Sequence, residues 1–375
     1  MRNKLRVGLI GAGGIMRKAH LNPGWLAVPD CQLVAVCDNH RENAVKLAED
    51  FNIPRVFEDH RELLELDEID VVDIATPNAF HAPFTIDALK AGKHVLCEKP
   101  LATTTAAIRS IREAADETGL LVMTAQQQRY TPSAVAIRRF LEGQPLGHVY
   151  HSRIHAVRRN WMPPAAGFID LSLSGGGPCM DIGVHALDMG LWLMGFPKPT
   201  RVTGRTMLNF AKDYDIPGGW GEWDHDRVET EDFASGFIHF ENGATMILEA
   251  CWLQHQHELE DFSARLFGRE GSIEWPSGRY SSAVNRALFD SVVSPATGLE
   301  KPYTEEILDF ADALRTGRPS PVPPSQSIQV TAILEALYES HRLNKEITLT
   351  SIPASETTEH TAVRVGNAEG REIEV

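Results

Sequence analysis

The sequence is poor in the features that mark several classes of protein. Its 375 residues include five cysteines, an odd number scattered along the chain without a Cys-x-x-Cys pair or a zinc-type spacing. This pattern argues against a disulfide framework and favours a reducing cytoplasm. No apolar run is long enough to span a bilayer, and the first residues lead directly into a short strand pattern. We therefore expect neither a signal peptide nor a membrane segment.

Positive charge is also scarce. The chain has 36 Lys and Arg against 51 Asp and Glu, a formal net charge of −15. An acidic protein of this kind is a poor partner for nucleic acid or for an anionic membrane surface. The hydrophobic content of 43% and the charged content of 23% are ordinary for a soluble globular protein. The length allows two domains, each with a core of its own.

The N-terminal third alternates short apolar strands with helical segments. Strands are expected over residues 5–10, 33–37, 71–74, 94–97 and 120–124, an order that predicts a parallel sheet with right-handed crossovers. Gly11 and Gly13 follow the first strand, in the strand–turn–helix context of a dinucleotide-binding fingerprint. Met16 stands where the third glycine of that fingerprint would be. The pattern predicts a Rossmann domain over residues 1–125.

Asp38 and Arg41 bear on the choice of dinucleotide. Asp38 ends the second expected strand, where a carboxylate accepts hydrogen bonds from the ribose hydroxyls of adenosine and repels a 2′-phosphate. It therefore favours NAD, although it also suits the N-cap of the helix expected over residues 41–51. Arg41 could pair with a 2′-phosphate, so that NADP stays open.

Two more polar segments follow expected strands: Thr76-Pro77-Asn78 and Glu98-Lys99-Pro100. Ligands of open parallel sheets bind at the carboxyl ends of the strands, which is where both segments lie. Lys99 is the notable residue, because a desolvated lysine loses pKa and becomes useful in proton transfer. The alternative for Lys99 is a solvated side chain in a surface turn.

The segment from Ser174 to about residue 194 combines a glycine-rich turn with an almost wholly apolar helix, which predicts burial. Asp181, His185, Asp188 and Trp192 nevertheless share one narrow face, at spacings of i, i+4, i+7 and i+11. Buried ionisable groups are costly unless they are paired. The stripe is therefore either a structural Asp–His network or a catalytic acid–base pair at the floor of a pocket.

These segments resemble the family of glucose–fructose oxidoreductase, inositol dehydrogenase and rhizopine-catabolism proteins (Gfo/Idh/MocA). The similar stretches are residues 8–15, 75–78 with His81, 91–100, 175–188 and 306–319. The resemblance implies that Lys99, Asp181 and His185 surround the reacting carbon, and that the Lys99–Pro100 bond is cis. The residues expected to bind the cofactor are Gly11, Gly13, Gly14, Ile15, Asp38, Arg41, Thr76, Pro77, Asn78, His81, Glu98 and Lys99.

Beyond residue 125 the pattern changes to strands joined without helices. Strands are expected over residues 148–158, 201–210, 232–240, 244–252, 263–267 and 271–275. They predict an α+β substrate and oligomerisation domain with a largely antiparallel open sheet over residues 126–350, followed by a tail over 351–375. The resemblance implies that one face of this sheet is an oligomer interface, in a homodimer or homotetramer.

Four residues of the second domain are candidates for substrate contact: Arg129, Arg158, Trp161 and Asp188. Trp161 could stack on a sugar ring or anchor its own loop, and Asp188 could line the pocket or anchor its helix. The loop over residues 212–227 is long for a strand connection and is a candidate lid or oligomer contact.

Histidines at 148, 151 and 155 invite a metal-binding interpretation, but their place on a strand and the cations beside them oppose it. No metal is expected.

With the resemblance, these residues predict an NAD(P)-dependent oxidoreductase that transfers hydride between nicotinamide and a secondary alcohol or ketone of a sugar, a sugar derivative or a cyclitol. His185 is expected to act as general base, Asp181 to orient it or to hold a neighbouring hydroxyl, and Lys99 to hydrogen-bond the reacting oxygen. The roles of Lys99 and His185 could be exchanged. Two alternatives stay open: an NAD-dependent glycosidase or lyase that oxidises its sugar transiently, and a non-catalytic NAD-binding regulator.

Overall fold

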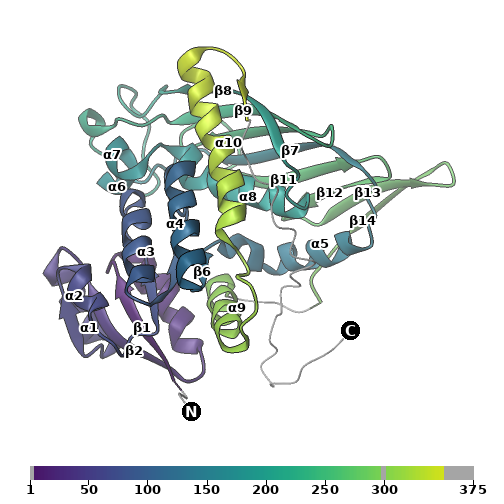
Figure 1. The fold of residues 1–375 in the computed structure, drawn as a ribbon. Coiled ribbons are helices and arrows are strands. Elements are labelled where there is room, and N and C mark those ends of the chain that lie inside the picture. The colour runs from purple at the N-terminus through teal and green to yellow at the C-terminus, as the bar shows by residue number, and fades with distance from the viewer. Residues whose placement is uncertain (1–3, 297–300, 350–375) are drawn as a thin grey trace.

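The computed structural model describes residues 4–296 and 301–349, and the tail expected over 351–375 lies outside these ranges. Two sheets dominate the fold (Figure 1). In the described ranges, no helix combines the length and hydropathy needed to cross a membrane.

The first sheet is parallel and has six strands in the order β3-β2-β1-β4-β5-β6. These strands are β1 (Leu5–Ile10), β2 (Cys31–Cys37), β3 (Arg55–Phe57), β4 (Val71–Ile74), β5 (His94–Cys97) and β6 (Val122–Thr124). The connections contain η1 (Met16–Gly24), η2 (Trp25–Ala27), α1 (Arg41–Phe51), α2 (His60–Leu64), η3 (Asn78–Phe80), α3 (His81–Lys90) and α4 (Thr105–Thr118). Because apolar residues of helices cover both faces of the strands, the sheet is buried on both sides, and the expected Rossmann topology is confirmed.

The second sheet is mixed and mostly antiparallel, in the order β14-β13-β12-β11-β7-β10-β9-β8-β15. Its strands are β7 (Val149–Arg158), β8 (Pro199–Met207), β9 (Phe233–Phe240), β10 (Thr245–Cys251), β11 (Glu260–Gly268), β12 (Gly271–Trp275), β13 (Arg279–Val284), β14 (Ala287–Val292) and β15 (Ile347–Thr348). β7 and β10 pair in parallel, and the other strands pair antiparallel. Burial alternates along β9 and β10, which is typical of an antiparallel sheet with one covered face.

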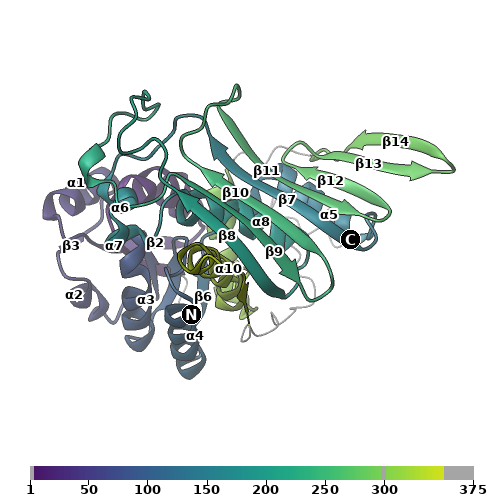
Figure 2. The same ribbon diagram turned by 90° about the horizontal axis from the view of Figure 1, so that it is seen from above.

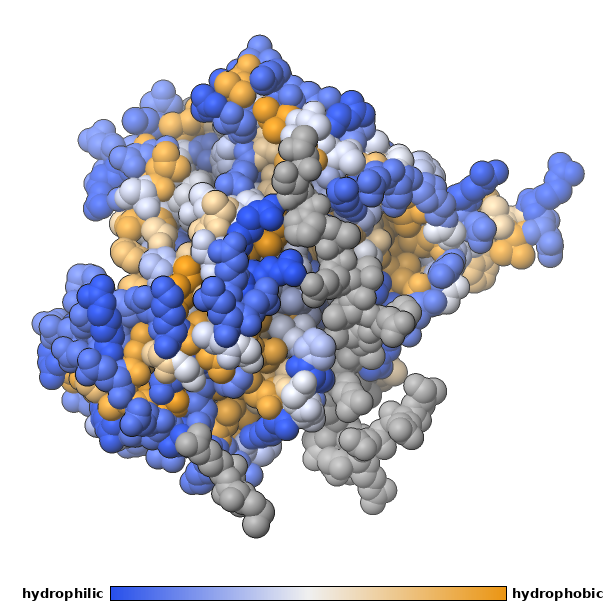
Figure 3. All heavy atoms as spheres, in the orientation of Figure 1, coloured by the Kyte–Doolittle hydropathy of each residue, from blue (hydrophilic) through white to orange (hydrophobic). Residues whose placement is uncertain are grey.

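The β13–β14 ribbon, which the sequence pattern did not predict, projects from the molecule at the edge of this sheet (Figure 2). Its side chains are mostly exposed, including Val284, Leu288, Phe289 and Val292. Figure 3 shows apolar surface on this projecting part. Apolar side chains left in water on a projecting ribbon are typical of a contact surface.

Helices form the cover on the buried face of the second sheet. Between β6 and β7 the chain forms η4 (Gln127–Tyr130) and α5 (Pro132–Glu142), and after β7 it forms α6 (Ala166–Ile169), α7 (Leu171–Ser174), η5 (Cys179–Gly183) and α8 (Val184–Leu193). The short helix η6 (His225–Arg227) lies between β8 and β9. α8 and α10 (Pro324–Leu343) bury their apolar residues against the strands, and α10 also contacts α4 of the first domain (Figure 2).

Helix α9 (Pro302–Thr316) belongs by position to the range predicted for the second domain, yet it packs against η1 and η4. Ile307 and Phe310 are fully buried in the same core cluster as Leu9 and Trp25 of the Rossmann domain. The chain thus returns to the first domain before α10. The boundary between residues 125 and 126 stays a prediction.

A buried ion pair fixes α8 against η4. Arg129 donates from Nε and Nη2 to the two carboxylate oxygens of Asp188, at 2.7 and 2.6 Å, and from Nη1 to Gln326 Oε1 at 2.7 Å. Both charged residues are 2% exposed, and the Arg129 guanidinium also lies over the Trp192 and Phe196 rings. The charge and hydrogen-bonding groups of each residue are therefore matched by the other in the interior.

We predict that Arg129→Met destabilises the protein by about 3–5 kcal/mol, because it leaves the Asp188 carboxylate buried without its partner. The double variant Arg129→Met/Asp188→Leu should recover most of this loss, since it removes both charges. Urea unfolding of the three proteins measures the effect. A single variant as stable as the wild type would contradict this role of the pair.

Candidate active site

The glycine-rich turn before η5 holds the start of the Asp181 helix in place. Glu231 accepts hydrogen bonds from Gly177 N at 2.9 Å and from the Tyr338 hydroxyl at 2.8 Å. A Cβ at Gly177 would lie 2.0 Å from Glu231 O, and one at Gly176 would lie 2.2 Å from Tyr338 Oη. Only glycine fits at these close approaches. The turn therefore sets the direction in which the following helix leaves it.

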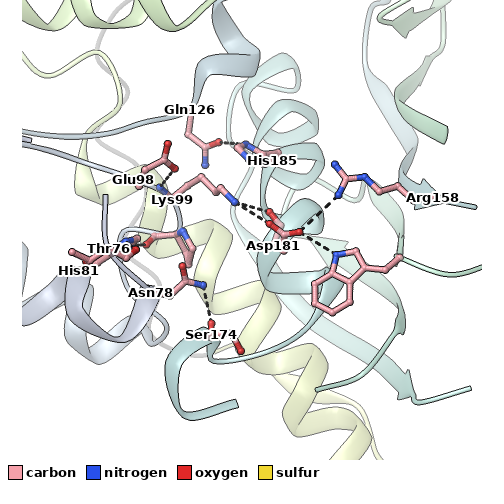
Figure 4. Close-up of polar contacts among 12 residues, drawn as sticks. Thr76, Asn78, His81, Glu98, Lys99, Gln126, Arg158, Ser174, Asp181 and His185 are labelled. Carbon is pink, nitrogen blue, oxygen red and sulfur yellow. Dashed lines mark hydrogen bonds and ion pairs between the residues drawn. The ribbon is translucent and has the colours of Figure 1, made fainter. Parts of the chain in front are cut away.

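Asp181 lies at the centre of a polar cluster on this helix (Figure 4). Lys99 Nζ donates to Asp181 O at 2.9 Å and to Asp181 Oδ1 at 3.3 Å. Trp252 Nε1 donates to Asp181 Oδ2 at 3.1 Å, and Arg158 Nη1 lies 3.9 Å from the same oxygen. The carboxylate is thus fixed by three neighbours, and its contact with Lys99 joins the end of β5 to the second domain.

His185, one turn farther along, is held by Gln126. Its Nδ1 lies 3.2 Å from Gln126 Oε1. Because an amide oxygen only accepts, this contact assigns the proton to Nδ1 and leaves the lone pair on Nε2. Burial, followed by the positive charge of Lys99, lowers the pKa of His185 to about 3. A neutral imidazole with a free Nε2 can accept a proton from a substrate hydroxyl.

A buried chain of ionisable groups supports the Lys99 backbone. Glu98 Oε2 accepts from Lys99 N at 2.9 Å, while Glu98 Oε1 accepts from His20 Nε2 at 2.9 Å. His20 Nδ1 donates to Asp73 at 2.9 Å, and Trp25 Nε1 donates to the same carboxylate at 2.6 Å. This chain ties the carboxyl ends of β4 and β5 together, because Asp73 lies on β4 and Glu98 follows β5. It therefore fixes the backbone of Lys99 through the hydrogen bond from Lys99 N to Glu98.

The protonation of this chain follows from its contacts. Burial works against the charged form of His20, but the charge and hydrogen bond of Asp73, with those of Glu98, raise the pKa of His20 well above 6.5. Burial likewise opposes the Glu98 carboxylate, yet His20 and Lys99 bring the pKa of Glu98 to about 2. Glu98 is therefore ionised, with its oxygens occupied by His20 and by Lys99 N.

The glycine turn after β1 is open where a dinucleotide would lie. Gly11 has φ +97°, and a Cβ there would lie 2.3 Å from Ala75 O, so the tight turn requires glycine. At Gly13 and Gly14 an added Cβ would meet nothing within 4 Å, and Ile15 is 39% exposed. The backbone of this turn is thus accessible to a pyrophosphate, and the residues present fit an NAD cofactor.

Asp38 and Arg41 lie beside this turn. Asp38 accepts from Ala12 N and from His40 N, both at 2.8 Å, so the carboxylate connects the end of β2 to the glycine turn. Arg41 is exposed, and its Nη1 lies 3.7 Å from Glu58 Oε1. Both Arg41 and Glu58 line an open pocket beside Asp38. Arg41 therefore already has an acidic partner.

The segment after β4 joins the two domains. Asn78 Nδ2 donates to Ser174 O at 2.8 Å, next to the glycine-rich turn. His81 is 1% exposed and lies between Pro100 O, 2.7 Å from Nδ1, and Thr76 O, 2.8 Å from Nε2. His81 thus links the ends of β4 and β5. Pro77 precedes η3, and a Cβ added at Gly167 of α6 would lie 3.8 Å from its side chain. The expected cis bond between Lys99 and Pro100 is present.

The structure separates the four substrate candidates into two groups. Arg129 and Asp188 pair with each other in the interior, whereas Arg158 reaches Asp181, and Trp161 stacks against Trp220. Sequence reasoning had missed His20, Asp73, Gln126 and Trp252. The place of Asp73 on an otherwise apolar strand was a signal for an internal partner, but nothing local indicates Gln126 or Trp252.

The histidines that invite a metal-binding interpretation have separate partners. His151 Nδ1 contacts Thr245 Oγ1 at 2.9 Å, whereas His155 Nδ1 contacts Asp261 at 2.8 Å. Across residues 4–296 and 301–349, no three His, Cys, Asp or Glu side chains are arranged to hold a metal.

Comparison with known proteins agrees with this geometry. Residues 5–126 match the model of an oxidoreductase family with an NAD-binding Rossmann fold, and residues 134–274 match the GFO/IDH/MocA C-terminal domain. The chain belongs to the Gfo/Idh/MocA family. It is accordingly an NAD(P)-dependent oxidoreductase with a small-molecule substrate, as the sequence had predicted.

Three relatives illustrate the range of this family. The chain is 29% identical to D-glucoside 3-dehydrogenase of Escherichia coli (strain K12), over 92% of this chain and 97% of that protein. It is 27% identical to scyllo-inositol 2-dehydrogenase (NAD(+)) of Bacillus subtilis (strain 168), over 89% and 92%. Levoglucosan dehydrogenase in complex with NADH and L-sorbose superposes with a TM-score of 0.80 at 26% identity, covering 93% of this chain and all of that one.

We predict that Lys99→Gln raises the pKa of His185 from about 3 towards 6.5, because it removes a cation while Glu98 and Asp181 remain. Lys99→Arg keeps the charge and should leave that pKa low. An NMR titration of the histidine ring nitrogens measures both, without any need for turnover. Equal His185 pKa values in the two variants would show that the Lys99 charge has no part in keeping the imidazole neutral.

Proposed function

We propose that this oxidoreductase interconverts a secondary alcohol and a ketone on a sugar, a sugar derivative or a cyclitol. The observation that carries the proposal is the convergence of Lys99, Asp181 and a neutral His185 at the end of β5, on the sheet edge that also carries the open glycine turn after β1. Hydroxyl-rich substrates suit a site with one acceptor nitrogen, one carboxylate and one ammonium group. The named relatives that act on a glucoside, on levoglucosan and on an inositol support the same class.

Each of the three residues has a distinct role in this proposal. His185 Nε2 takes the hydroxyl proton during oxidation, because Nδ1 already carries a proton held by Gln126. Lys99 Nζ donates to the reacting oxygen and stabilises its developing negative charge. Asp181, fixed by Trp252, orients Lys99 and accepts from a neighbouring hydroxyl. Bound NAD supplies the hydride acceptor, and the residues that would hold it are those of the glycine turn, Asp38 and the strand ends.

Arg129 and Asp188 are proposed as positioning residues, since they face each other in the interior. Arg158 and Trp161 keep their proposed contact with the substrate. His81 and Glu98 act on the cofactor site indirectly, because their hydrogen bonds fix the backbone at the strand ends.

We also infer that the protein works as a homodimer or homotetramer in the cytoplasm. The apolar side chains exposed on the β13–β14 ribbon, and Phe237 and Ile247 on the outer face of the second sheet, support association through this part of the molecule. The five cysteines are all unpaired, which supports a reducing compartment.

A panel of sugars, sugar acids and inositols, offered with NAD and NADP in parallel, tests the function. We predict net accumulation of reduced cofactor with at least one sugar or cyclitol. His185→Ala should lower turnover of that substrate by roughly 10²–10⁴-fold, because the general base is lost. An unchanged turnover would remove His185 from the mechanism. A product formed without net reduced cofactor would instead favour the glycosidase or lyase, and NAD binding without any turnover would favour a regulator.

We predict that the wild-type enzyme prefers NAD, because the Asp38 carboxylate would face a 2′-phosphate and Arg41 is already paired with Glu58. Asp38→Ser should lower the ratio of kcat/KM for NAD to that for NADP by about tenfold or more. Arg41→Ala is the matched control and should leave the use of NAD unchanged. A wild-type preference for NADP would contradict this assignment.

A further inference from the structure

A stack of two indole rings and a guanidinium group lies beyond Asp181. The Trp161 and Trp220 rings are nearly parallel, at 7°, with centroids 6.0 Å apart, and we call them the tryptophan pair. The Arg158 guanidinium carbon lies 4.6 Å from the centre of the Trp220 ring. Trp220 is 50% exposed, although it is one of the largest apolar side chains in the sequence. A large exposed aromatic beside an active site needs a reason.

The tryptophan pair is held rigidly by its own loops. Gly219 N donates to Asn160 O at 2.7 Å, and Asn160 Nδ2 donates to Pro217 O at 2.9 Å. A Cβ at Gly219 would lie 2.4 Å from the Trp161 ring, so the loop approaches as closely as glycine permits. The base of the same loop is fixed because Asp232 accepts from the backbone of Asn209, Phe210 and Ala211. The tryptophan pair is therefore held in place before a ligand binds.

Arg158 connects the tryptophan pair to the reacting groups. It ends β7, lies 3.9 Å from Asp181 Oδ2 and donates from Nε to Glu260 Oε1 at 3.0 Å. Figure 4 shows Asp181 between Lys99 on one side and Arg158 on the other. The order outward from the cofactor domain is thus Lys99, Asp181, Arg158 and then Trp220. A substrate whose reacting carbon lies beside Lys99 can contact Trp220 only if it carries a substituent that extends past Asp181.

Building on the function proposed above, we propose that the tryptophan pair and Arg158 form a second subsite, which binds the substituent of a neutral glycoside. The C–H face of a sugar ring, or an aryl group, packs on indole with a gain beyond simple burial of area. Sequence reasoning considered stacking for Trp161 alone. The structure adds Trp220, from a loop about 60 residues away in sequence, and stacks its ring on that of Trp161.

Charge decides between a neutral and an acidic substituent. Lys99 and Arg158 bring two positive charges, which Asp181 and Glu260 balance, while His185 is neutral. Arg158 is therefore not a free cation awaiting a carboxylate. An acidic substituent would also approach two carboxylates in a protein with a net charge of −15. The subsite is thus suited to an uncharged sugar, alkyl or aryl group.

The test compares free glucose with its methyl and phenyl glycosides, both anomers of each, in the wild type, Trp220→Ala, Trp161→Ala and Trp220→Phe. We expect the wild type to prefer a phenyl glucoside over glucose in kcat/KM. Either alanine variant should lower that preference by about three- to tenfold, through KM rather than kcat. Trp220→Phe keeps a ring and should retain most of the preference. Calorimetric binding of phenyl glucoside to the NADH-loaded protein gives a readout independent of turnover.

The possible results distinguish a failure of the proposed subsite from a failure of the proposed function. Turnover of sugars with no preference for the glycoside, or a preference unaffected by both alanine variants, overturns the subsite and leaves the oxidoreductase intact. No turnover of any sugar or cyclitol by the wild type overturns the function itself. Phenyl glucuronide should be used less well than phenyl glucoside, and the reverse order would overturn the neutral character of the subsite. Binding of NADH by the alanine variants confirms that they are folded.

Discussion

The contact between Lys99 and Asp181 is the interaction on which the site depends. It crosses from the end of a Rossmann strand to the helix of the second domain, and it places an ammonium group and a carboxylate next to each other in a largely water-excluded position. A pair of this kind is costly to bury unless every remaining hydrogen-bonding position is used. Trp252 donates to the other carboxylate oxygen and Arg158 Nη1 lies 3.9 Å from it, so both oxygens of Asp181 have a polar neighbour.

The arrangement of charge around this pair also explains the state of His185. A buried imidazole near Lys99 gains a proton only at low pH, so that it stays a base throughout the neutral range. His20 has the opposite environment, between two carboxylates, and stays protonated. Two buried histidines in one protein are thus held in different protonation states, and the neutral state of His185 is the one that its proposed role as general base requires.

Much of the fold and of the site followed from the sequence, because strand ends and helix spacing are local properties. The glycine turn, Asp38, Lys99 and the Asp181–His185 face are each visible in a few adjacent residues. Other features depend on contacts between distant segments. Arg129 and Asp188 carry no local sign that they face each other, and α9 returns to the first domain because Ile307 and Phe310 complete its core. The β13–β14 ribbon was missed because its side chains do not alternate between a buried and an exposed face.

Isotopic labelling tests whether hydride passes directly from a C–H bond of the substrate to the nicotinamide. A sugar or cyclitol that the enzyme oxidises is prepared with deuterium at all its carbon-bound positions, and the reduced cofactor is then examined by NMR. We expect one deuterium at nicotinamide C4, matched mole for mole by ketone product. Reduced cofactor without deuterium, or sugar conversion without net reduced cofactor, would contradict it.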